Sequence, residues 1–248
     1  MAYYSRQTVL PEVGYEGQTR FKDSKVCLVG LGGLGSRTAI QLATMGTGHM
    51  RIVDYDVVEI SNLQRQILYD INVLGCSKVE IAAKRLVELN PYVNIEPLSQ
   101  KLDFCNANTI IQGMDLVVDG LDNMTARYAL NKACQELGVP YIFAAAIINF
   151  GIVSTILPDE TPCLECFYGN AVDNMLPKTQ EVGVNPNILG IVSSIEVSEA
   201  VRLILGNKPN LAAKLIHCDI NYLDFDVINI TKALNCPVCG DKPTESKN

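Results

Sequence analysis

"KVCLVGLGGLGS" occupies residues 25–36 and decides the fold that this chain adopts. The apolar run 26–29 predicts a buried strand, which a glycine-rich turn connects to the start of a helix. Free backbone N–H groups and a helix N-terminus at such a turn attract phosphate, and glycine lets the phosphate approach without meeting a Cβ atom. We therefore expect a nucleotide to lie against four glycines of the turn: Gly30, Gly32, Gly33 and Gly35.

The next stretch, "HMRIVDYD" (49–56), predicts a second strand, and Asp54 near its end is placed to accept hydrogen bonds from ribose hydroxyls. Farther along, Ser77 and Glu80 are spaced for a capping box at a helix start. Strands and helices alternate, which predicts an α/β fold with a Rossmann-like, mostly parallel sheet and helices on both faces. The later elements expected in this part are a helix at 75–91, a strand at 115–123, a helix at 125–138 and a strand at 141–147.

The alternation changes after about residue 150. We expect a single domain over 1–248, with a nucleotide-binding half at 1–150 and a second half at 151–240. The final residues, 241–248, are polar and predict a loose tail. The elements expected in the second half are a strand at 151–158, an irregular stretch at 170–187, an apolar helix at 188–205 and a strand at 214–220.

Composition narrows the class of protein. Hydrophobic residues make up 48% of the 248 and charged residues 19%, which is enough apolar material for a sizeable core. A formal net charge of -7 argues against a nucleic-acid partner, because phosphate backbones attract basic surfaces. The longest apolar run is too short to span a membrane, and the N-terminus does not resemble a signal peptide. We expect a cytoplasmic protein with no membrane contact.

The polar run "ISNLQRQI" (60–67) is unusual so close to a nucleotide-binding turn. Arg65 carries a guanidinium fork that suits phosphate oxygens. Lys78 begins a helix, where a cation opposes the helix dipole and is tolerated when it faces an anion. Asp122 follows a strand and is a suitable Mg²⁺ ligand. Together these side chains suit a triphosphate better than a dinucleotide.

The alternative ligand for such a fold is a nicotinamide dinucleotide. A dehydrogenase of this kind usually needs a proton donor such as histidine beside its cofactor. The chain has two histidines, His49 and His217, and both fall in expected strands without an evident partner. This alternative also leaves the polar run unexplained.

Nine cysteines are present, and four of them form the pairs "CLEC" and "CPVC". Two such pairs have the composition of a closed, structural Cys₄ zinc site, which would hold the C-terminal segment against the domain. A redox-active CxxC is the alternative, but it lacks the expected βαβ setting and leaves the second pair unexplained. The expected zinc ligands are Cys163, Cys166, Cys236 and Cys239. The other five are interpreted as small core residues: Cys27, Cys76, Cys105, Cys134 and Cys218.

The motifs, taken in order, resemble those of the ubiquitin-activating-like adenylyltransferases, the family of MoeB, ThiF and HesA. The resemblance rests on "GLGGLGS", "DYDVVEISNLQRQ", "GCSKVE", "VVDGLDN" and the CxxC pairs, and it extends from residue 5 to residue 240. It implies ATP and Mg²⁺ on a Rossmann-like sheet, usually in a homodimer. It also implies adenylation of the C-terminal glycine of a small ubiquitin-like sulfur carrier ending in Gly-Gly, which the second half would bind.

The resemblance assigns roles to individual residues. A carboxylate is already nucleophilic at neutral pH, so adenylation needs alignment and charge neutralisation more than a general base. An arginine aimed at transferring phosphate contributes on the order of 10³-fold or more to the rate by analogy with phosphoryl transfer. In the resemblance Asp54 holds the ribose, the phosphates are contacted by Asn62, Arg65 and Lys78, magnesium is bound by Asp122, and Arg6 reaches the ATP of the neighbouring protomer.

One position departs from the family. Some relatives carry a cysteine in C-x-x-x-G-V that links covalently to the carrier, whereas this chain has Thr179 there. A hydroxyl of ordinary pKa is a poor sulfur carrier, so we expect the reaction to stop at the acyl-adenylate and to need a separate sulfur donor. The carrier could serve molybdopterin, thiamine or tRNA thiolation. Two further alternatives are adenylation of a short peptide in natural-product maturation and a non-catalytic binding scaffold.

Overall fold

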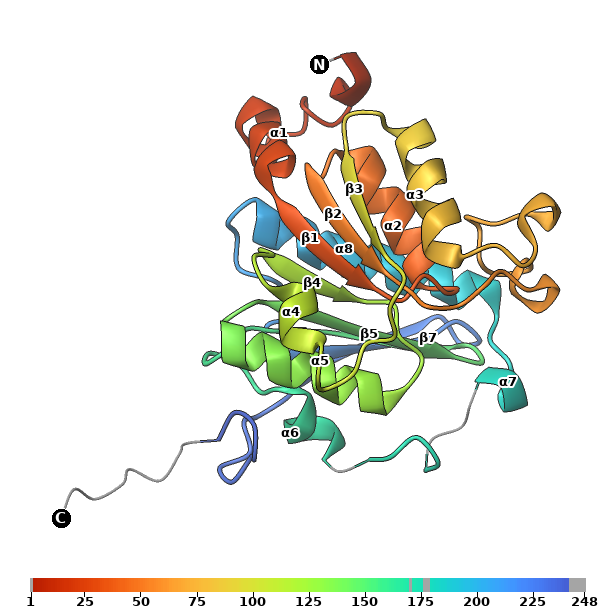
Figure 1. Cartoon of the computed structure of the whole chain (residues 1–248). Helices are drawn as coiled ribbons and strands as arrows, with labels where there is room; N and C mark the ends of the chain where they lie inside the picture. The colour runs from red at the N-terminus through yellow and green to blue at the C-terminus, as the bar shows by residue number, and fades with distance from the viewer. Residues whose placement is uncertain (1, 170, 176–178, 241–248) are drawn as a thin grey trace.

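The computed structural model of the chain describes residues 2–169, 171–175 and 179–240, and it is built on one eight-stranded sheet (Figure 1). The strand order is β3-β2-β1-β4-β5-β6-β7-β8, with parallel pairing from β3 to β5 and antiparallel pairing from β5 to β8. The mostly parallel α/β fold is thus confirmed. The strands are β1 (Lys25–Val29), β2 (His49–Val53), β3 (Asn94–Leu98), β4 (Leu116–Asp119), β5 (Tyr141–Ile147), β6 (Phe150–Ile156), β7 (Lys214–Asp219) and β8 (Asp224–Asn229).

Helices cover the sheet on both faces, as the sequence predicts. Helices α2, α3 and α8 pack on one face, and α4, α5 and α6 contribute to the core on the other. The helices are α1 (Gly14–Asp23), α2 (Gly35–Met45), α3 (Lys78–Leu89), α4 (Ala107–Ile111), α5 (Met124–Leu137), α6 (Leu164–Tyr168), α7 (Thr179–Val182) and α8 (Pro186–Ile204). Three short 3₁₀ helices are η1 (Ala2–Tyr4), η2 (Ile60–Asn62) and η3 (Ile71–Val73). None of the described helices is long and apolar enough to cross a membrane.

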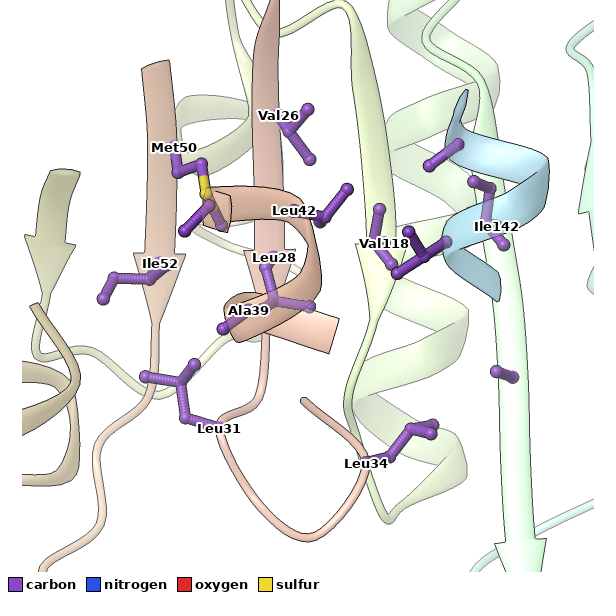
Figure 2. Close-up of a cluster of buried hydrophobic side chains, with 14 of the residues drawn as sticks. Val26, Leu28, Leu31, Leu34, Ala39, Leu42, Met50, Ile52, Val118 and Ile142 are labelled. Carbon is purple, nitrogen blue, oxygen red and sulfur yellow. The ribbon is translucent and has the colours of Figure 1, made fainter. Parts of the chain in front are cut away.

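Strand β1 is apolar at every position after Lys25 because it is buried on both faces of the sheet. Val26 and Leu28 belong to the core under α2, α3 and α8, whereas Cys27 and Val29 belong to the core on the other face. A strand buried on both faces needs apolar side chains at every position. Figure 2 shows Leu42 of α2 lying over this part of the sheet, between side chains of β1 and those of neighbouring strands.

Several local expectations need correction. Ser77 is the N-cap of α3, but its side chain accepts no capping hydrogen bond, and its hydroxyl is buried without a partner among the described residues. The backbone N–H of Lys78 instead donates to the carbonyl of Asp56 at 3.0 Å, so the helix start is joined to the loop after β2. Cys76 and Cys105 are exposed because both lie in loops, whereas Cys27, Cys134 and Cys218 are buried as expected.

Candidate nucleotide site

The glycine turn after β1 is packed too closely for any side chain at two of its positions. Gly30 has φ +93°, and a Cβ atom on Gly35 would lie 1.9 Å from the carbonyl oxygen of Gly30. Gly120, in the loop after β4, approaches the same oxygen, and a Cβ there would lie 2.2 Å from it. These three glycines therefore bring the ends of β1 and β4 and the start of α2 together.

The middle of the same turn is open. A Cβ on Gly32 would meet nothing nearer than Gln66 Nε2 at 3.9 Å, so this side of the turn has room for a ligand. The backbone N–H groups of Gly32 and Gly33 donate to no acceptor within the described part of the chain. Free N–H groups at a helix start form a concave site that favours phosphate. The turn thus has both the space and the donors that an anion requires.

Asp54 lies directly after β2 and is bonded to the turn. Its carboxylate accepts hydrogen bonds from the backbone N–H of Leu31 at 2.7 Å and of Asp56 at 2.8 Å. The side chain is largely buried, and this burial raises its pKa against the opposing effects of Lys78 and the two N–H donors. A carboxylate has about four acceptor sites, so two remain for ribose hydroxyls. Tyr69 also holds the turn, because its hydroxyl donates to the Leu31 carbonyl at 3.0 Å.

The polar run 60–67 folds over the glycine turn. Asn62 is buried in η2, and its side-chain oxygen accepts the Glu59 N–H at 3.1 Å. Arg65 donates from Nη1 to the Ser61 carbonyl at 2.7 Å, and its Cγ would lie 3.3 Å from a Cβ built on Gly33. The aliphatic part of Arg65 thus lies against the turn that carries the open N–H groups.

Gln66 is a residue that the sequence interpretation missed. It is only 3% exposed, its Oε1 is buried without a described hydrogen-bond partner, and its Nε2 is the atom nearest to the open side of Gly32. A buried amide without a partner costs free energy unless a ligand or water satisfies it. The sequence does contain a signal for Gln66, because it stands four residues after the predicted site residue Asn62. In the structure this spacing forms one helical turn, in which the Gln66 N–H donates to the Asn62 carbonyl at 2.9 Å.

Lys78 is buried beside the same turn, and its side chain forms an ion pair within the protein. Its Nζ lies 2.9 Å from Asp56 Oδ2, and its side chain is 6% exposed compared with 48% for Asp56. The partner is a carboxylate of the protein two residues after Asp54. Asp56 offsets part of the free-energy cost of burying this cation next to the nucleotide-binding loop.

Asp122 and Arg6 lie on opposite sides of the fold. Asp122 lies in the loop after β4 and is exposed, and among the described residues its side chain receives only a 3.3 Å contact from the Asn123 amide. Arg6 is also exposed, and it lies between Tyr4 and Gln7, which contact the C-terminal ends of α3 and α2. Those helix ends lie away from the glycine turn, so Arg6 is not brought to the site of its own chain.

The two CxxC pairs come together as predicted. The Sγ atoms of Cys163, Cys166, Cys236 and Cys239 all lie within 4.8 Å of one another. Their closest contacts join one cysteine of each motif, with Cys163–Cys236 at 3.5 Å and Cys166–Cys239 at 3.3 Å. A Cys₄ zinc with Zn–S bonds of about 2.3 Å holds its sulfurs roughly 3.8 Å apart, so the cluster permits zinc. A redox CxxC would instead pair the two cysteines of one motif.

Other proteins match this chain along most of its length. A model of the ThiF family matches residues 4–238. The SAMP-activating enzyme E1 of Haloferax volcanii is 37% identical over 98% of this chain and 90% of its own. The sulfur carrier protein adenylyltransferase of Thermus thermophilus is 38% identical over 98% of this chain and 92% of its own.

Longer proteins match as well. An adenylyltransferase and sulfurtransferase MOCS3 of Drosophila grimshawi is 38% identical, but this chain spans only 55% of it. The crystal structure of E. coli MccB with ATP shares the fold, with a TM-score of 0.85 at 23% identity over 96% of this chain and 75% of that one. Because the family model matches nearly the whole chain, the protein belongs to the ThiF family.

Proposed function

We propose that the protein is an ATP-dependent adenylyltransferase that activates the C-terminal glycine of a small ubiquitin-like sulfur carrier. The observation that carries the proposal is the pair of backbone N–H groups of Gly32 and Gly33, which have no acceptor among the described residues and adjoin the open side of Gly32. Arg65 packs against Gly33, and Lys78 is buried beside the same turn. Relatives that match nearly end to end are named as a SAMP-activating enzyme and as a sulfur carrier protein adenylyltransferase.

In the proposed reaction the carrier's carboxylate oxygen attacks the α-phosphorus of ATP. A P–O bond forms to the glycine, the bond from the α-phosphorus to the bridging oxygen breaks, and pyrophosphate leaves with the electron pair. Asp54 accepts the ribose hydroxyls, while Asn62, Arg65 and Lys78 contact the phosphates. No general base is needed because the attacking group is already ionised.

Two metals belong to the proposal. Asp122 suits Mg²⁺ because its exposed carboxylate is an oxygen donor with one weak contact, and Mg²⁺ commonly binds one or two carboxylates together with substrate phosphates. When bound, Mg²⁺ would neutralise charge on the phosphates. The four clustered cysteines would hold a structural zinc, which four thiolates close to substrate.

The assembly and the cellular setting are also proposals. Arg6 lies away from the glycine turn of its own chain, so its assigned role requires a homodimer in which it reaches the partner's ATP. Residues 1–150 would bind the nucleotide, and 151–240 would bind the carrier and zinc. Free thiols in a Cys₄ site suit the reducing cytoplasm. The expected loose tail, 241–248, lies outside the described residues.

Exchange of labelled pyrophosphate into ATP tests the proposed activity. We expect exchange that depends on Mg²⁺ and on an added carrier protein with an intact Gly-Gly tail. The same carrier without its last glycine is the matched control and should support none. Exchange supported by free short peptides would favour peptide maturation instead, and NADH binding without ATP binding would favour a dehydrogenase.

Thr179, at the start of α7, leads to a second prediction. Because a hydroxyl does not form the sulfur link that a cysteine forms, the product should remain an acyl-adenylate until a separate sulfur donor removes it. Intact-mass spectrometry of enzyme, carrier and Mg·ATP without reductant should show no covalent enzyme–carrier adduct. An adduct that disappears on adding reductant would contradict this expectation.

A further inference from the structure

Arg127 in the first turns of α5 has no role in the site as described, yet it is buried and extensively bonded. Its Nε donates to Asp119 Oδ2 at 3.0 Å, and its Nη2 donates to the carbonyls of Leu121 at 2.6 Å and Ala144 at 2.9 Å. The residue is 7% exposed, and Asp119 is fully buried. A buried arginine is kept only where its donors are satisfied, so the guanidinium is fixed in place.

These bonds hold the backbone of one residue, Leu121, in the loop after β4, because they engage the peptide groups on both sides of it. The N–H of Leu121 donates to Asp119 Oδ1 at 2.7 Å, and the carbonyl of Leu121 accepts from Arg127. Just before it, Gly120 is packed against the carbonyl of Gly30. Gly120 therefore packs against the glycine turn, and the next residue, Leu121, is hydrogen-bonded to the buried Asp119–Arg127 pair.

Asp122 is the residue that depends on this arrangement. Within the described part of the chain its exposed side chain has one weak contact, at 3.3 Å from the Asn123 amide, so its position is set by the backbone of the loop rather than by its own bonds. A carboxylate that binds Mg²⁺ must sit at a defined place relative to the phosphates. The loop can supply that placement only while the backbone of Leu121 is held.

We propose that Arg127 is a positioning residue that holds the Leu121 carbonyl and thereby places Asp122, the next residue, for Mg²⁺ at the nucleotide site. The inference rests on the proposed function through the role of Asp122. Arginine suits this task because its planar fork reaches a carboxylate and two carbonyls at once. A lysine keeps the charge opposite Asp119 but does not reproduce that fork.

The test compares Arg127→Lys with Tyr141→Phe. The Tyr141 hydroxyl donates to the same Asp119 oxygen at 2.5 Å and is fully buried, but its side chain makes no described bond to Leu121. Calorimetry measures ATP binding at a series of Mg²⁺ concentrations, with melting temperature and zinc content measured alongside. Arg127→Lys should raise the Mg²⁺ concentration for half-maximal binding by about tenfold, the size of effect seen for outer-shell partners of metal ligands. Tyr141→Phe should change it by less than about twofold.

Each outcome decides a specific point. An equal shift in both variants, or no shift in either, overturns the positioning role and leaves only a structural one. In an Asp122→Asn background, Arg127→Lys should cause no additional shift, since the two changes act on one contact. If Arg127→Lys does not fold, the double variant Asp119→Asn/Arg127→Gln, which removes both buried charges together, is measured in its place with the same expected direction. A wild-type protein that does not bind Mg·ATP overturns the proposed function together with the inference, whereas normal wild-type binding with unchanged variants overturns the inference alone.

Discussion

Replacing Arg65 with alanine should lower carrier-dependent pyrophosphate exchange by about 10³-fold or more, the loss typical of an arginine that stabilises transferring phosphate. The reason is geometric. The aliphatic part of the Arg65 side chain packs on Gly33. Its guanidinium donates to only one protein acceptor among the described residues, the Ser61 carbonyl. The rest of the guanidinium is free for phosphate oxygens next to the open N–H groups. Initial exchange rates at saturating ATP and carrier measure the effect.

Arg85→Ala is the matched control for this prediction. Arg85 is also in the first half of the chain, but it is 44% exposed and pairs with Asp70 at 2.5 Å on the surface. Surface ion pairs of this kind contribute roughly 0–1 kcal/mol, so exchange should stay within about twofold of wild type. Zinc content and melting temperature should match wild type in both variants. Exchange at the wild-type rate by Arg65→Ala would contradict the phosphate role of the polar run.

The parts of the site that follow from local sequence were predictable. The glycine turn lies between an apolar strand and a helix, and Asp54 follows the next strand, so periodicity places both. Lys78 illustrates the limit. Its position at a helix start suggested an anion, but its partner Asp56 is 22 residues away in a loop whose path no local pattern specifies. The same limit hid the Arg127 bonds to Leu121 and Ala144.

His49 shows that failing to predict one strand also prevents the prediction of the contacts made to it. Strand β3 contains Pro97, which reads as a strand breaker, yet proline is tolerated on an edge strand because one row of N–H groups there has no neighbour. The sequence analysis does not predict β3, so it offers His49 no partner. In the fold its Nε2 lies 3.0 Å from Glu96, and Asn94 lies 2.9 Å from its other ring nitrogen. The histidine is thus part of a surface cluster on the sheet edge.

The cysteine cluster gives the second large expected effect. Changing Cys236 to serine should remove zinc and lower the melting temperature by about 10 °C or more. Structural zinc contributes several kcal/mol to folding, and each kcal/mol shifts the midpoint by roughly 2–4 °C for a chain of this size. The loss arises because the C-terminal segment carrying Cys236 lies beside α6 (Figure 1), where its two cysteines meet those of the CLEC motif and its Ala233 N–H contacts Cys166 Sγ. Metal analysis and calorimetric melting measure both effects.

Cys76→Ser separates this effect from general cysteine loss, because Cys76 is exposed and lies outside the cluster. That variant should keep its zinc and melt within about 2 °C of wild type, as surface substitutions usually change stability by less than about 0.5 kcal/mol. The CLEC motif is also held by hydrogen bonds that need no metal. Asn131 on α5 accepts the Leu164 N–H at 3.1 Å and donates to Glu165. The CLEC motif should therefore stay docked without metal while the CPVC segment detaches. Hydrogen exchange in Cys236→Ser should then rise in residues 230–240 and stay low in 163–168, and equal exchange in both segments would contradict this asymmetry.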